Sequence, residues 1–125
     1  PPRMEGKKRK ADLLQEIERN PFKFPRLSEE LRSDREIALA GVMRNGINLR
    51  VVAGRCKSDP EVVLAAVKDR GYALQYASES CKNEREIVLA AVTQASFALQ
   101  HASDACKADR EIVLAAVTQA WQALK

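Results

Sequence analysis

The sequence predicts an all-α fold, a short α-solenoid of about five two-helix repeats of 25 residues, the first degenerate and the last incomplete. Three observations predict it. Related segments return at a fixed interval without gaps, each contains an apolar run too broad for one helix face, and each run follows residues that cap helices. A strand-plus-helix horseshoe is the alternative, because the runs also contain β-branched residues.

The interval appears when Ser33, Ser58, Asn83 and Ala108 are placed beneath one another. The repeats then span residues 33–57, 58–82, 83–107 and 108–125, and residues 8–32 form a weaker first copy. Terminal repeats are often atypical, because one of their sides faces water. Leucine and valine coincide in every later copy and are expected to form the core: Leu39, Val42, Leu64, Val67, Leu89, Val92, Leu114 and Val117.

The first helix of each repeat is predicted by its start and by its apolar run. In "SDPE" either Ser58 or Asp59 can cap the helix, and the proline that follows suits the first turn. Asn83 and Asp109 are expected to cap the later copies. The side chains of "VVLAAV", residues 62–67, point almost all round the axis, so this helix is expected to be buried on every side.

Glycine is expected to end the first helix in two repeats, at Gly46 and Gly71. A second helix is predicted over residues 73–82, where Leu74, Ala77 and Cys81 form one apolar stripe. This helix would cover the first, and successive pairs would stack.

The cysteines Cys56, Cys81 and Cys106 share one repeat position. A spacing of 25 residues is not that of a zinc site. Adjacent helices lie about 8–10 Å apart, whereas the Cα atoms of a disulfide lie at most about 6.8 Å apart. We therefore expect buried structural thiols, and three unpaired thiols favour a reducing compartment.

The segments "LQYASESCKNEREIVLAAV" and "LQHASDACKADREIVLAAV" resemble a repeat family called domain of unknown function 4116. "LSEELRSDREIALAGVMRNGINL" is similar, and the resemblance covers about residues 27–125. It implies a helical repeat of protists, algae and some bacteria, with no catalytic or ligand-binding residues to transfer. It also suggests an organellar assembly in an alga, in a plastid or mitochondrion, as the setting.

Enzymatic chemistry is not predicted. His101 is the only histidine, and Val51 and Tyr76 hold its position in other repeats, which indicates a half-exposed packing role. The sequence has no phosphate-binding glycine loop, no Ser/His/Asp set and no HExxH motif. We therefore expect no catalytic residue, no metal site and no cofactor. The apolar stretches also fall short of the roughly 20 residues that a membrane-spanning helix needs.

Basic residues are concentrated in residues 1–10, the basic head, which is expected to be flexible and separate from a repeat domain over 11–125. Its Lys7, Lys8, Arg9 and Lys10 could bind an acidic protein, RNA or an anionic lipid surface. A further basic residue closes each repeat: Arg32, Lys57, Lys82 and Lys107. This basic ladder either complements helix ends or forms a track for RNA, which is the alternative function. Aligned glutamates four residues further on are expected to weaken its field.

Trp121 stands where the earlier repeats have glycine. Because the second half of the last repeat is missing, Ile112, Ala115 and Ala116 are expected to be partly bare, with Trp121 beside them as an anchor. The alternative is that Trp121 folds back as a lid. The expected function is a non-catalytic scaffold or protein–protein interaction subunit, an accessory component of a larger assembly that binds other proteins through Trp121 and the basic head.

Overall fold

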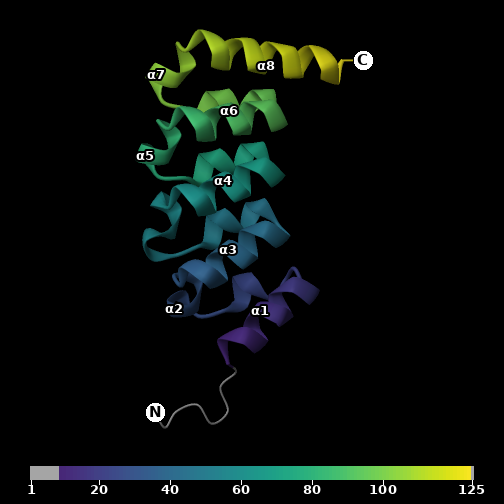
Figure 1. Cartoon of the computed structure of the whole chain (residues 1–125), viewed down its shortest axis with the longest axis vertical. Coiled ribbons are helices and arrows are strands. Elements are labelled where there is room, and N and C mark those ends of the chain that lie inside the picture. Colours follow the sequence, from purple (N-terminus) through teal and green to yellow (C-terminus); the bar gives the residue numbers. More distant parts are fainter. Residues whose placement is uncertain (1–8, 125) are drawn as a thin grey trace.

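The computed structural model describes residues 9–124, which form an elongated all-α stack (Figure 1). One long helix from each repeat lies in a single column, and each contacts the next. These helices are α1 (Lys10–Arg19), α3 (Arg35–Arg44), α4 (Pro60–Asp69), α6 (Arg85–Gln94) and α8 (Arg110–Ala123). No strand occurs among residues 9–124, so the solenoid prediction is confirmed and the horseshoe alternative is wrong.

The second half of each repeat consists of two short pieces rather than one helix. The first piece is a 3₁₀ segment: η2 (Phe24–Arg26), η3 (Gly46–Val51), η5 (Gly71–Tyr76) or η6 (Ser96–His101). The second is about one helical turn: α2 (Glu29–Arg32), η4 (Gly54–Ser58), α5 (Glu79–Lys82) or α7 (Asp104–Lys107). In Figure 1 α2, α5 and α7 lie along one edge, opposite the free ends of the long helices.

The helix predicted over residues 73–82 is therefore wrong as a continuous element. The backbone becomes extended at Ala77, with φ −78° and ψ 162°. Ser78 then accepts a hydrogen bond from the N–H of Cys81 and starts a new helix. A serine side chain that caps a helix competes with continuation of the preceding one, which explains the break.

Aspartates cap three of the long helices. Asp34, Asp59 and Asp109 each accept two backbone N–H bonds. The prediction for Asp109 is confirmed, and of the two candidates Ser58 and Asp59 the cap is Asp59. The prediction for Asn83 is wrong: α6 begins one residue later, after Glu84, which makes no side-chain cap bond. The side-chain oxygen of Asn83 instead accepts a hydrogen bond from the hydroxyl of Ser103, at 2.7 Å.

The glycines expected to end helices have a different role. The residues that follow α3 and α4 are Asn45 and Arg70, both extended, and neither Gly46 nor Gly71 has a positive φ. Both glycines are buried where a 3₁₀ segment meets the next long helix. A Cβ atom on Gly71 would collide with the carbonyl oxygen of Ala91, so glycine is needed there for close approach.

These close approaches are also hydrogen-bonded. The first N–H of η3, η5 and η6 donates to a side chain of the following long helix, at 2.5–2.7 Å: Gly46 to Asp69, Gly71 to Gln94 and Ser96 to Gln119. The N–H groups at the start of a helix otherwise lack partners. The bonds thus tie each repeat to its successor.

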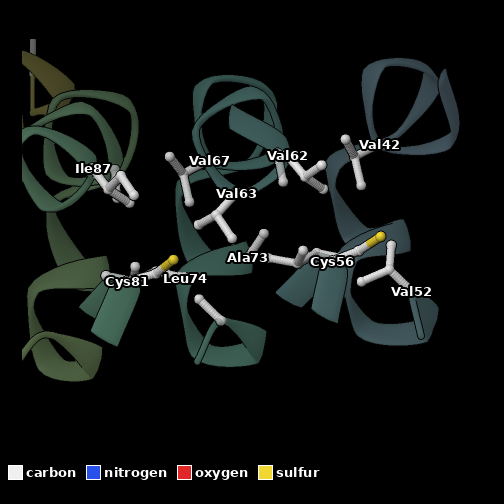
Figure 2. Packing of buried hydrophobic residues seen from close by; sticks show 14 of the residues in the cluster. Val42, Val52, Cys56, Val62, Val63, Val67, Ala73, Leu74, Cys81 and Ile87 are labelled. Atoms are coloured by element: carbon white, nitrogen blue, oxygen red, sulfur yellow. The ribbon is translucent and has the colours of Figure 1, made fainter. Parts of the chain in front are cut away.

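The core follows the column (Figure 2), and Val42, Val67 and Val92 are fully buried as predicted. Leu39, Leu64 and Leu89 are only half-buried, whereas Leu114 and Val117 are exposed. The expectation that the long helices are buried on every side is therefore wrong. Neighbouring long helices cover two sides and the 3₁₀ layer a third, and the fourth stays open.

Candidate functional site

The last long helix carries an exposed apolar surface. Four large side chains, three in α8 and one at its C-cap, share one stripe and are 53–81% exposed: Leu114, Val117, Trp121 and Leu124. They follow at i, i+3, i+7 and i+10, so they point within a narrow sector of the helix. We call this stripe the C-terminal face.

The exposure of the C-terminal face follows from its place in the stack. Val117 is 59% exposed, although Val67 and Val92 at the same repeat position are fully buried. Figure 2 shows why: Val67 points from α4 toward Ile87 of the next long helix. Among residues 9–124 no long helix follows α8, so Val117 has no such neighbour.

The prediction of bare residues on α8 is wrong for Ile112 and Ala116. Ile112 is fully buried and Ala116 is 6% exposed, whereas Ala115 is half-buried. Figure 2 shows Val62, the counterpart of Ile112, pointing back toward the preceding helix, which explains the burial. Trp121 is 63% exposed and lies within α8, so it does not act as a lid.

Ion pairs join successive long helices. In three interfaces a cation at the first helical residue reaches two carboxylates of the next helix, one at its N-cap and one two residues later. The sets are Lys10 with Asp34 (3.1 Å) and Glu36 (2.8 Å), Arg35 with Asp59 (2.5 Å) and Glu61, and Arg85 with Asp109 (2.8 Å) and Glu111. Pro60 holds the cation position of α4, so that interface lacks the pair. Arg110 holds it in α8 and pairs with no carboxylate of residues 9–124.

Backbone hydrogen bonds join the repeats in the same way. The carbonyl of the residue that closes one repeat accepts an N–H from the next, at 3.0–3.2 Å: Arg32 from Ala53, Lys57 from Ser78 and Lys82 from Ser103. The corresponding carbonyl of Lys107 accepts no backbone N–H within the described part of the chain. Two kinds of inter-repeat contact thus stand unfilled beside the C-terminal face.

The basic ladder is partly structural. The guanidinium of Arg32 donates to the carbonyls of Leu27 (3.0 Å) and Val51 (2.6 Å), which end two successive 3₁₀ segments. This geometry favours the helix-end interpretation at Arg32. The aligned glutamates pair with the cations of the preceding long helices where a partner exists, as Glu61 does with Arg35.

The basic head is only partly described. Lys7 and Lys8 lie outside the described residues, and Arg9 is the exposed N-cap of α1. Lys10 is the first residue of α1, and its bonds to Glu36 and Asp34 raise the pKa of its ammonium group. Lys10 therefore belongs to the repeat stack rather than to a separate head.

Cysteine and histidine occupy packing positions. Cys56, Cys81 and Cys106 are free and buried, as predicted, and burial raises the pKa of the Cys56 and Cys81 thiols. His101 is half-buried, and burial together with Lys82 and Lys107 lowers its pKa. No group of His, Cys, Asp and Glu among residues 9–124 has an arrangement that could hold a metal ion.

The open side of the long helices is lined by shallow grooves. Grooves of about 490 Å³ between α1 and α3, and about 360 Å³ between α6 and α8, have floors of leucine and alanine. Leu39 and Ala40 line the first, and Leu114 and Ala115 line the second. The second groove therefore runs into the C-terminal face.

A second apolar column, not predicted from the sequence, runs along the 3₁₀ segments. Large apolar residues occur every 25 residues at Phe22, Ile47, Tyr72 and Phe97, and Phe22 (74%) and Phe97 (57%) are exposed. The rings of Tyr72 and Phe97 stack with centroids 6.0 Å apart. The sequence signal for this column is that a large apolar residue directly follows the repeat position of Gly46 and Gly71.

One of three comparisons with known proteins found a match. A search of curated proteins and a search of solved structures found no match. In the described part of the chain no helix has the length and apolar character needed to cross a bilayer. The model of the family described as Domain of unknown function (DUF4116) matches residues 17–53 and 59–105, more than half of the chain. The chain therefore belongs to the DUF4116 family of helical repeats.

Proposed function

We propose that this protein is a non-catalytic scaffold or interaction subunit, an accessory component of a larger assembly, that binds another protein through its C-terminal face. The observation that carries the proposal is the exposure of Val117 and Leu124, whose counterparts Val67 and Leu74 are fully buried inside the stack. Exposed apolar patches of this kind mark interaction surfaces, and tryptophan is a favoured anchor.

The size of the face limits what it can do alone. Complete burial of a large apolar side chain contributes about 1.5–3 kcal/mol, so burying the exposed parts of these four side chains contributes about 4–8 kcal/mol. Association costs about 4–15 kcal/mol in lost translational and rotational freedom. A stable complex therefore needs polar contacts beyond the apolar stripe.

Binding of RNA or an anionic surface has less support. Arg32 is engaged with two carbonyls and Lys10 with two carboxylates, which leaves a broken row of basic residues. We also propose that the protein is located in a reducing compartment, either the cytoplasm or the interior of a plastid or mitochondrion. Three unpaired buried thiols support the reducing compartment.

The proposal is tested by crosslinking mass spectrometry in native extract with wild-type protein and with Trp121→Ala. Crosslinks to partner proteins from residues 110–124 should be lost in Trp121→Ala. Met43→Ala is the matched control, because Met43 is 67% exposed on another helix. An unchanged crosslink pattern in Trp121→Ala would remove the C-terminal face from the proposal.

A further inference from the structure

We infer that the C-terminal face binds a repeat of this same kind, whose long helix opens with a capping aspartate and a glutamate two residues later. The inference rests on the proposed function and names the chemistry of its partner. Three unfilled contacts at the end of the stack carry it: an ion pair, a backbone hydrogen bond and an apolar contact.

The unfilled ion pair of Arg110 favours a partner helix with carboxylates at its start. Lys10, Arg35 and Arg85 each reach the N-cap carboxylate and the following glutamate of the next long helix. Arg110 holds the same helical position and is exposed. A helix packed on α8 as α8 packs on α6 therefore brings its N-cap and second residue to Arg110. Carboxylates there would form charge-assisted bonds like those of Arg85.

The backbone bond requires more than an isolated helix. The carbonyls that correspond to Lys107 accept the N–H of the second residue after a 3₁₀ segment, as Lys82 accepts from Ser103. A donor for the Lys107 carbonyl thus comes with a whole repeat, a long helix followed by a 3₁₀ segment. This contact favours a repeat over a lone amphipathic helix.

The apolar contact argues against the N-terminal end of a second copy. The residue that faces the preceding helix is β-branched and at most 3% exposed in the inner stack: Ile37, Val62, Ile87 and Ile112. In α1 this position holds Asp12, and the positions of the two carboxylates hold Arg9 and Ala11. An unmodified α1 would set Asp12 against Val117 and a cation against Arg110. The N-terminal end of a second copy is therefore not the partner.

The full-length chain itself provides a probe. The triple variant Arg9→Asp, Ala11→Glu, Asp12→Ile gives α1 the opening that α3 and α8 have, at three exposed positions. Ser28 already stands at the repeat position of Ser103. The variant should therefore associate head to tail in sedimentation velocity, whereas the wild-type chain should stay monomeric.

Two further substitutions in the triple variant separate the contacts. Val117→Asp should abolish the association. Arg110→Gln should weaken it about tenfold, as expected for a charged hydrogen-bonded pair. The matched control is Arg26→Gln, an exposed arginine that forms no ion pair among residues 9–124 and should leave the association unchanged.

Three results would overturn the inference. A folded triple variant that stays monomeric shows that the face does not accept such a repeat. If the Arg110→Gln and Arg26→Gln forms of the triple variant associate equally strongly, Arg110 does not recognise carboxylates of the partner. Apolar docking and the proposed function would then still hold. Wild-type dimers that Val117→Asp dissociates show that the face binds a second copy instead. Loss of crosslinks in Trp121→Ala tests the proposed function independently of all three.

Discussion

A methyl group added at Gly41 tests how the first two repeats pack. Gly41 lies inside α3, and its Cβ atom would lie 2.6 Å from two ring carbons of Phe24 and 2.9 Å from a third. Ordinary contact begins at 3.4 Å, so the ring must retreat by about 0.8 Å. Phe24 is fully buried, which leaves the ring little room to move.

The expected effect of Gly41→Ala combines two opposing contributions. Overpacking a core costs about 1–3 kcal/mol. Alanine inside a helix is about 1 kcal/mol more stable than glycine. The free energy of unfolding should therefore fall by about 0–2 kcal/mol, although the same change in an unconstrained helix would raise it by about 1 kcal/mol.

The other repeats show how the cost can be removed. Leu49 and Leu74 stand at the repeat position of Phe24, and Ala66 stands at that of Gly41. The larger ring in the first repeat is thus matched by a smaller residue in the second. The double variant Phe24→Leu/Gly41→Ala restores the inner pairing, and the two changes should couple favourably by about 2 kcal/mol.

Urea denaturation of the four proteins, followed by far-UV circular dichroism, measures this coupling. Phe24→Leu alone should be destabilised, because it leaves a gap beside Gly41. Additive effects in the double variant, or a Gly41→Ala protein that is about 1 kcal/mol more stable than wild type, would refute the reasoning.

Three further expectations concern the contacts between repeats. Gly71→Ala should lower the free energy of unfolding by at least about 3 kcal/mol in urea, because the methyl group meets a backbone carbonyl, whereas Ser96→Ala at the same repeat position should change it by under about 0.5 kcal/mol. Pro60→Arg should be more stable than Pro60→Ala by about 0.5–1 kcal/mol, because it supplies the missing ion pair, and Glu86→Gln should remove part of that difference. The side-chain bond to an arginine lowers the pKa of Asp109, and a lowered pKa stabilises the fold above the unfolded value of about 3.9. Lowering the pH below about 4 should therefore lower the Tm of the wild-type protein. The decrease should be smaller in Asp109→Asn, which lacks this carboxylate.

The repeat period predicted most of the stack. Residues at the same repeat position have similar surroundings inside the stack. The burial of Val42, Val67 and the cysteines therefore followed from the period and the helical pattern alone. The caps at Asp59 and Asp109 followed from residue type. These features depend on local sequence and on neighbours that repeat identically.

The break within the second half of each repeat could not be predicted in this way. The stripe of Leu74, Ala77 and Cys81 fits a continuous helix as well as two short pieces, since all three are buried in either case. The choice depends on whether Ser78 caps a new turn, and the backbone bond from its N–H to the Lys57 carbonyl of the previous repeat favours the break.

The exposed side of the long helices also could not be predicted from the sequence. Six consecutive apolar residues point in all directions, so only the layers around α4 decide that Val67 is buried and Leu64 half-buried. The same ambiguity led to the choice of Ile112 instead of Val117 as a bare residue on α8.

The two ends of the stack differ, and the difference gives the molecule a direction. At the start, Asp12 stands where inner helices carry a β-branched residue, and it is exposed. At the other end, Val117 keeps the residue of the inner helices but has no neighbour among the described residues. Of these two terminal positions, only Val117 therefore keeps a residue that neighbouring repeats bury between them. A partner that adds to this stack without rearranging it should therefore add there.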